Sequence, residues 1–306
     1  MSDTMISTDE VDAWLVDLEV EALGAPAEKP KPQPNSVATV VRRGLLIFAV
    51  TILAFLAFAL WLSGLSHARS QVGLQRRFRT ELGALSAPVG GVIAPGSPVA
   101  NLRISSAGVN EVVVEGLRSG QLRGGPGHVV GTPLPGQPGN AVIAGRRTMY
   151  GGPFKHIGSL ARGDRIAVVT GQGASTYRVT GVKIYRSTTG SMFGDYGDNR
   201  LTLVTADPPL RGSRRLVVTA KLVERPYTAT DLSRTLDPEG LGLTGERGAI
   251  AVVLVWLELL VALLLLGVYA MTRWSRWTAW VVFVPALSLV TWLFFEHVVM
   301  LLPATL

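Results

Sequence analysis

The chain has 306 residues, a formal net charge of +7 and 48% hydrophobic residues, but no cysteine. Without cysteine it has no disulfide, no thiolate metal site and no thiol nucleophile. Long apolar runs exclude an ordinary soluble protein. The sequence therefore predicts a membrane protein that binds no metal and no cofactor.

Residues 1–43 form an acidic tail and linker. Ser7 followed by Glu10 is a capping-box pattern, which predicts the start of a helix. The apolar residues that continue at helical spacing are Val11, Trp14, Leu15, Leu18 and Ala22. A short acidic amphipathic helix is expected, ending at Gly24 before a Pro/Lys-rich linker. Two interpretations stay open: a tail that is disordered when free, or a docking helix for a cytoplasmic partner.

Three apolar runs, residues 44–65, 249–271 and 278–302, are each long enough to cross a bilayer, which takes roughly 20 residues. The first is not a cleavable signal peptide, because a long polar segment precedes it and its apolar core is too long. We therefore expect three transmembrane helices in a multi-pass membrane protein.

The basic residues around these runs give a divided signal for orientation. Arg42 and Arg43, with Arg273 and Arg276, favour a cytoplasmic location for the N-terminus and for the turn between the last two runs. The opposing residues are Arg69, Arg76, Arg77, Arg79 and Arg247. Charge alone does not choose between the two orientations.

Between the first two runs lie a basic stalk and linker (66–99), a β-rich segment (100–223) and a polar tether (224–248). Short β-type runs recur from Asn101 to Leu222, with turns such as Pro138-Gly139-Asn140 between them. This spacing predicts a mainly β domain, a closed or nearly closed antiparallel-rich barrel. Its basic charge suggests an anionic surface or partner. Nucleic acid is not expected, because no basic helix or aromatic-interleaved strand appears.

One strand of this domain ends abruptly. Residues 201–206 read as an apolar and β-branched strand that stops at Ala206, before Asp207 and two prolines. A catalytic nucleophile often lies at such a strand end. Here the last side chain is a methyl group.

Several motifs occur in a specific order: Glu115-Gly116, Gly125-Pro126-Gly127-His128, Pro135 to Thr148, and Leu201 to Val218. Together they resemble the sortases, membrane-anchored cysteine transpeptidases of Gram-positive surfaces, and most of all the class E branch of actinobacteria. The resemblance implies an eight-stranded β-barrel, here flanked by three transmembrane helices.

An active sortase resembling this chain would have a histidine after Ala-Gly, a cysteine closing the Thr-Leu-x-Thr strand and an arginine opening the next strand. At the matching positions this chain has Arg146, Ala206 and Arg215. Arg214 is the less favoured match for the last role. Two of the three catalytic groups are thus replaced, which indicates a pseudo-sortase.

The neighbouring residues offer no simple substitute. A methyl group cannot attack an amide, and an arginine exchanges no proton near neutral pH. Thr205 is a poor nucleophile in place of Ala206, because neighbours on a strand point to opposite faces. Nothing in the sequence places His128 or His156 at the vacant position.

What remains is a cleft expected to be lined by Arg146 and Arg215, with Asp207 and Thr205 as further ligand-binding candidates. In one interpretation, the two guanidinium groups hold a carboxylate, a phosphate or a sorting-signal peptide. In the other, the cleft has decayed and its arginines pair with Asp207 or with solvent.

Two features lie outside the barrel. Glu258 lies within the second apolar run, where an acid usually faces other helices or water; candidate partners on the third run are Ser288, Thr291 and His297. The C-terminal stretch Leu302–Leu306 begins like a sorting signal but lacks the following glycine. It is read either as coincidence or as an internal pseudosubstrate.

The leading hypothesis is a catalytically inactive, sortase-like protein of the cell membrane. Its barrel would be extracellular and would bind or scaffold cell-surface proteins or wall components, with membrane proteins or a sorting-signal-like peptide as partners. One rival is an active, cysteine-independent peptidase or transpeptidase of the same family. Another is a subunit of a membrane transport complex, supported only by Glu258.

Overall fold

The computed structural model describes residues 37–186, 194, 196–209, 214–230, 249–273 and 276–301. It has two compact units, residues 1–53 and 54–306. The described part of the first unit is the beginning of helix α2 (Val37–Ala57). The expected helix after Ser7 and the stretch Leu302–Leu306 lie outside the described residues.

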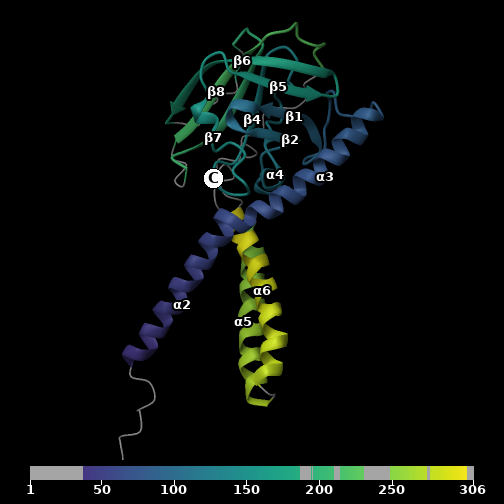
Figure 1. Ribbon diagram of the computed structural model, residues 1–306. Helices are drawn as coiled ribbons and strands as arrows, with labels where there is room; N and C mark the ends of the chain where they lie inside the picture. The colour runs from purple at the N-terminus through teal and green to yellow at the C-terminus, as the bar shows by residue number, and fades with distance from the viewer. Residues whose placement is uncertain are drawn as a thin grey trace, which may run out of the picture. The chain divides into compact units, whose positions relative to one another are not determined.

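Eight strands of the second unit close into a barrel in the order β1-β2-β3-β4-β7-β8-β6-β5 (Figure 1). The strands are β1 (Pro98–Ile104), β2 (Val109–Glu115), β3 (Gly127–His128), β4 (Asn140–Ala144), β5 (Arg165–Thr170), β6 (Gly173–Tyr185), β7 (Arg200–Asp207) and β8 (Arg214–Leu222). Only β2–β3 and β4–β7 pair in parallel. The barrel predicted from the spacing of the β-type runs is confirmed.

Short helical turns connect the strands: η2 (Ser105–Ala107), α4 (Ser119–Gly124) and η3 (Ile157–Ser159). The six-residue helix α4 lies between β2 and β3 along the chain. It has no apolar periodicity of its own, so its position depends on what it packs against.

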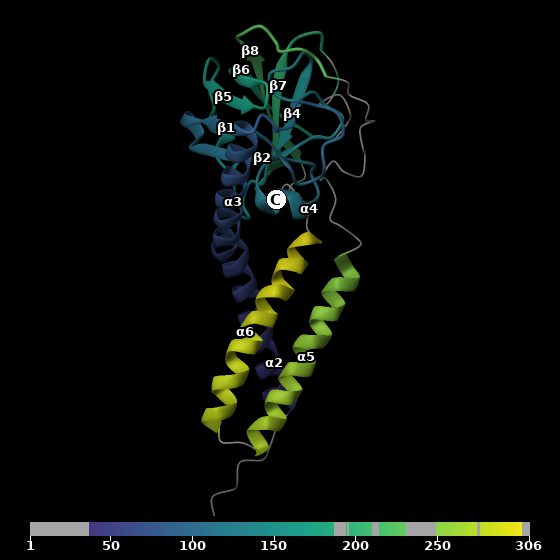
Figure 2. The ribbon, with the colours of Figure 1, turned by 90° about the vertical axis from the view of Figure 1, so that its right-hand side faces the viewer.

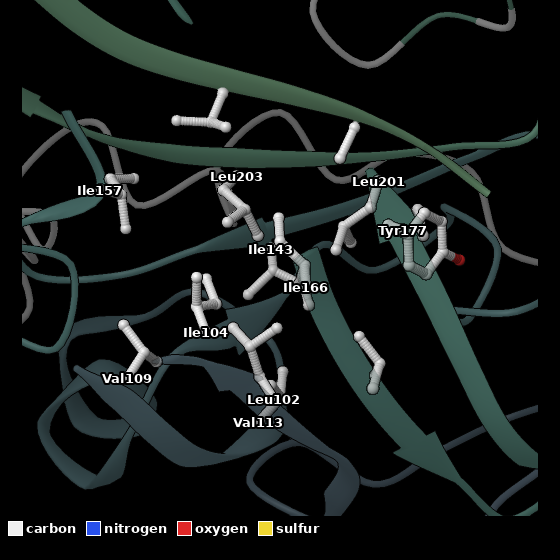
Figure 3. Packing of buried hydrophobic residues seen from close by; sticks show 14 of the residues in the cluster. Leu102, Ile104, Val109, Val113, Ile143, Ile157, Ile166, Tyr177, Leu201 and Leu203 are labelled. Carbon is white, nitrogen blue, oxygen red and sulfur yellow. The ribbon is translucent and has the colours of Figure 1, made fainter. Parts of the chain in front are cut away.

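The barrel is filled by branched aliphatic side chains that alternate along the strands. Figure 3 shows Leu201 and Leu203 of β7 pointing into the interior toward Ile143 and Ile166. The intervening side chains point to the opposite face. There Val204 packs with other apolar residues in a second cluster, whose members are Leu117, Leu122, Val129, Val142, Ala144 and Val217. Both faces of β4 and β7 are therefore covered, and their residues are almost all buried.

The first apolar run is helical, but not as one regular α-helix. Helix α2 is followed by a π-helical turn, η1 (Phe58–Leu62), and then by α3 (Ser63–Gly83), which includes the basic stalk residues. Beyond this turn, α3 carries a buried face with His67, Gln71 and Phe78. Phe78 packs with Val112 of β2.

Helices α5 (Ala249–Arg273) and α6 (Arg276–Met300) run side by side (Figure 2). Within the described part of the chain, two segments are long and apolar enough to cross a membrane: Ile250–Gly267 and Trp277–Met300. The structure thus supports two of the three expected membrane-spanning helices. The run 44–65 is interrupted by the π-helical turn, and the side chains of only some of its residues are described.

Candidate functional site

The three positions singled out in the sequence lie at or just beyond the ends of three neighbouring strands of the barrel. Ala206 of β7 is paired with Arg215 of β8. On the other side, β4 pairs with β7 through Ala144 and Val204, and the Gly145 amide continues this ladder by donating to the Val204 carbonyl at 3.0 Å. Arg146 follows at once, so the register places it beside Ala206. The expected row of positions is present.

The middle of this row has no reactive group. Ala206 has 0% exposure, and its carbonyl oxygen accepts a hydrogen bond from Nη1 of Arg147 at 2.9 Å. The neighbouring hydroxyl of Thr205 is also fully buried and donates to the Gly145 carbonyl at 2.8 Å. Its proton is already used and Thr205 is enclosed within the fold, which does not support the expected ligand-binding role.

Arg146 is buried rather than open to a cleft. Only 1% of it is exposed, and it donates from Nε to the Leu122 carbonyl and from Nη2 to the Ser119 carbonyl, both at 3.3 Å. Its guanidinium also lies over the ring of Tyr150, 4.9 Å from the centroid. A buried charge needs such partners to offset desolvation. Arg146 thus ties the end of β4 to α4, which corrects the expectation that it lines an open cleft.

Arg215 is also almost fully enclosed, with 3% exposure, and donates from Nη1 to the Arg214 carbonyl at 3.2 Å. Burial lowers the pKa of its guanidinium, but an arginine stays protonated near neutral pH. Arg146 and Arg215 are both buried and therefore do not form the expected cleft with two accessible arginines.

Asp207 binds two arginines, but not the two expected. Its Oδ1 accepts from Nη1 of Arg147 at 3.2 Å, and its Oδ2 is 2.8 Å from Nη2 of Arg214. The expected partners were Arg146 and Arg215. Arg147 directly follows the first of these in the sequence, and Arg214 directly precedes the second. The alternation of side chains at strand ends brings Arg147 and Arg214 to the carboxylate, while Arg146 and Arg215 turn inward.

An open hollow of ≈ 170 Å³ lies on the outer face of β6, β8 and β7. It is lined by Lys183, Tyr185, Tyr196, Arg200, Thr202, Val217 and Thr219. Tyr185 is paired with Arg215, which places the hollow on the same strands as Ala206 and Arg215. Sequence reasoning missed this hollow. The available signal was a pair of tyrosines, Tyr185 at the end of β6 and Tyr196 shortly before β7.

Arg200 in this hollow is held in place by its neighbours. Its guanidinium stacks over the ring of Tyr196, 4.0 Å from the centroid, and Nη2 donates to Asp198 at 2.8 Å. Lys183, in contrast, is exposed and forms no ion pair with any carboxylate among the described residues. Among the residues that the structure describes, the hollow therefore offers one uncompensated cation beside aromatic rings and threonine hydroxyls.

The motif residues Glu115 and His128 form a buried pair elsewhere in the barrel. Nδ1 of His128 is 2.8 Å from Oε2 of Glu115, and both side chains are at most 4% exposed. Nε2 of His128 is 3.0 Å from the Pro133 carbonyl and 3.0 Å from Oγ1 of Thr132. His128 is paired with Ile143 across β3–β4, and both of its ring nitrogens are engaged inside this buried cluster. It therefore does not stand in for a histidine at the position of Arg146.

Glu258 is exposed on α5, and within the described residues no side chain forms a hydrogen bond or an ion pair with it. Two of its expected partners on α6 bond to their own helix. Ser288 donates to the Val284 carbonyl at 2.8 Å, and Nδ1 of His297 is 2.7 Å from the Leu293 carbonyl. The structure does not bring Glu258 together with them.

The sortase domain model matches residues 102–223, from β1 through β8. Sortase SrtE1 of Streptomyces coelicolor is 28% identical to this chain over 192 residues, which cover 57% of this chain and 54% of that protein. The chain therefore spans about half the length of this curated relative.

Solved structures of sortases are also similar. Sortase E from Streptomyces avermitilis is 32% identical and covers 44% of this chain and 93% of its own, with a TM-score of 0.40. The Sortase D5 transpeptidase of Clostridium perfringens is 25% identical and covers 52% of this chain and 99% of its own, with a TM-score of 0.44. The domain match spans the strands β4, β7 and β8 that precede or carry Arg146, Ala206 and Arg215. Residues 102–223 therefore form a sortase domain, and the curated relative of this chain is a sortase E.

Proposed function

We propose that this sortase-family domain binds a cell-surface protein or wall component without cutting it. The observation that carries the proposal is the row of Arg146, Ala206 and Arg215 across three neighbouring strands. The strands that would present a catalytic site are complete, but the central side chain is a buried methyl group. Such a domain is suited to binding rather than to acyl transfer, which needs a nucleophile and a proton donor.

The rival proposal, a cysteine-independent peptidase or transpeptidase, requires a relocated nucleophile. Thr132 is the best-placed hydroxyl, because it adjoins His128, which in turn adjoins Glu115. However, Thr132 is only 4% exposed and donates its proton to the Val129 carbonyl at 2.8 Å. A hydroxyl whose proton points away from the base is poorly arranged for attack. This contact favours the binding function.

We place the ligand in the hollow between β6, β8 and β7. The exposed ammonium of Lys183 attracts an anionic group, and the tyrosine rings offer flat apolar surfaces beside polar hydroxyls. A peptide with a carboxylate, such as a sorting-signal-like segment, matches this combination. An acidic wall component shares the same chemistry and would compete for the same hollow.

The proposed setting is the cell membrane of a Gram-positive, actinobacterial cell. The run 44–65 would provide a third span in addition to α5 and α6, with the barrel on the extracellular side and residues 1–43 in the cytoplasm. Partners in the membrane would then contact the membrane-spanning helices, and partners on the cell surface would contact the barrel. A transport-complex subunit is the remaining alternative, and only Glu258 favours it.

The binding proposal is tested with full-length protein in detergent micelles and a fluorescent sorting-signal peptide, using fluorescence anisotropy. Lys183→Glu should weaken binding by about fivefold, the effect of losing roughly 1 kcal/mol of ion pairing. Arg103→Glu, which makes the same charge change at an exposed position on β1, should leave binding unchanged. If Lys183→Glu and Arg103→Glu bind the peptide equally well, the hollow is not the peptide-binding site.

A second variant examines whether only the chemistry was lost. Ala206→Cys combined with Arg146→His restores the two replaced side chains. If this double variant folds but does not bind the sorting-signal peptide, the proposal that the domain keeps a peptide-binding function fails.

A further inference from the structure

Helix α5 has two faces, and α6 occupies one of them. The side chains on that face are partly or fully buried and recur at spacings of four and three residues: Trp256, Leu260, Leu263, Gly267 and Ala270. Trp256 lies 5.7 Å from the ring of His297, and Leu263 and Ala270 pack against Phe283. A Cβ at Gly267 would be 3.2 Å from Phe283. This face is closely packed.

Glu258 lies on the opposite face. At about 100° per residue, it is turned roughly 160° away from both Trp256 and Leu260. The residues that share its face also follow a spacing of four and three and are all exposed: Ala251, Val255, Ala262, Leu265 and Tyr269. Val255 and Leu265 are 62% and 66% exposed. The second face of α5 thus has the regular spacing of a helix-packing surface, and no other described helix of the unit formed by residues 54–306 packs on it.

The depth of Glu258 makes this exposure costly. It is the ninth residue of the apolar segment Ile250–Gly267, about 12 Å from one end and about 14 Å from the other at 1.5 Å per residue. A carboxylate at the centre of a bilayer is strongly unfavourable unless another group pairs with it. Lipid chains offer no hydrogen-bond donor. A partner that supplies one would relieve the cost.

We infer that the Glu258 face of α5 is an intramembrane docking surface for a transmembrane helix of another protein that carries a lysine or arginine at mid-membrane depth. Charge complementarity selects this occupant: a basic side chain neutralises the carboxylate and donates hydrogen bonds to it. A second copy of this chain would instead bring a second acid to the same depth. The small side chains of Ala251 and Ala262 allow a partner helix to approach closely. This inference does not depend on ligand binding by the barrel.

The experiment uses full-length protein in lipid vesicles with a labelled transmembrane peptide, followed by energy transfer. The probe is a helix of about 20 leucines with one central lysine, and its control has leucine at that position. We expect the lysine peptide to bind wild-type protein roughly tenfold more tightly than it binds Glu258→Leu. Leu264→Ala, which changes an exposed residue of α5 outside the Glu258 face, should bind like wild type.

A charge exchange gives an independent readout. Glu258→Lys should lose its preference for the lysine peptide and prefer a peptide with a central glutamate. Equal binding of the lysine peptide to wild type and Glu258→Leu would overturn the inference. So would failure of Glu258→Lys to reverse the preference.

The absence of cysteine from the chain allows the competing occupant to be tested directly. In membranes, Ala262→Cys reports on the Glu258 face and Leu264→Cys on a neighbouring surface. If Ala262→Cys forms a disulfide-linked homodimer and Leu264→Cys does not, the face binds a second copy of this chain, and the inference of a basic partner is wrong. If neither variant forms a homodimer, the proposed heterologous partner is supported.

Discussion

The end of β7 and the middle of α5 use their charged side chains in opposite ways. Around Ala206, Arg146 bonds to carbonyl groups near α4, and Asp207 pairs with Arg147 and Arg214. On α5, Glu258 meets no partner within the described residues. In the first region, the charged side chains bind to other groups of the same fold and hold it together. In the second, Glu258 has no such partner in the described part of the chain, and we infer that a helix of another protein provides one. Charges kept within the fold should affect stability, whereas Glu258 should affect assembly.

The largest stability effect is expected at Arg146. Arg146→Ala leaves the Ser119 and Leu122 carbonyls without their donor and opens a void beside Tyr150. We expect a loss of about 3 kcal/mol in the free energy of unfolding, measured in detergent by denaturant titration. The control Arg103→Ala, at an exposed position, should cost less than about 0.5 kcal/mol. Equal stability of the two variants would show that Arg146 holds nothing in place.

A pH-dependent effect of similar size is expected at Tyr177, whose hydroxyl accepts from the Gly136 amide at 2.6 Å. Burial raises its pKa from 10.0 to about 12. The folded state therefore favours the neutral phenol. This contribution is complete below pH 10 and is lost as the pH rises toward 12. The loss is about 2.7 kcal/mol for two pKa units.

Unfolding measured between pH 9 and 12 should show this slope in wild type but not in Tyr177→Phe. Tyr196→Phe, at a half-exposed position, should keep the slope. If Tyr177→Phe keeps it as well, another group is responsible.

A smaller loss of stability is expected when Asp207 is replaced, and this loss should exceed that for an exposed surface ion pair. Asp207→Ala removes contacts to both Arg147 and Arg214, where Asp207 is 12% exposed. We expect a cost of about 1.5 kcal/mol. Arg77→Ala, which breaks an exposed pair with Glu81 one helical turn away, should cost about 0.3 kcal/mol. Similar costs for the two variants would mean that Asp207 contributes no more than a surface charge.

The smallest stability effect is expected at Glu258. Because no described side chain pairs with it, Glu258→Leu should change the free energy of unfolding of the isolated protein in detergent by less than about 0.5 kcal/mol. A large loss of stability would reveal a partner within the chain. The contrast between the two regions would then disappear.

The barrel could be predicted from local signals, because β-branched runs separated by turns mark its strands. The row of Arg146, Ala206 and Arg215 was implied instead by the resemblance to the sortases, and the strand register places these positions side by side. The burial of Arg146 could not be predicted in this way. It depends on α4, a six-residue helix with no periodic pattern, which is brought over β4 by packing of Leu117 and Leu122.

The partners of Asp207 were missed by one residue for a related reason. At a strand end, alternation decides which of two adjacent arginines turns inward, and a shift of one position exchanges their roles. For Glu258, the helical period of the sequence was sufficient to predict which face of α5 it occupies. The spacing from Trp256 to Ala270 marks the face used by α6, and Glu258 lies outside it.

The most direct test of the central claim is a transpeptidation assay. Full-length protein is incubated with a sorting-signal peptide and a nucleophilic amine, and the products are followed by mass spectrometry, with an active sortase E as the positive control. We predict that the peptide stays intact and that no amine-linked product appears. A hydrolysed or amine-linked product that depends on this protein would contradict the account and show that the domain still cuts what it binds.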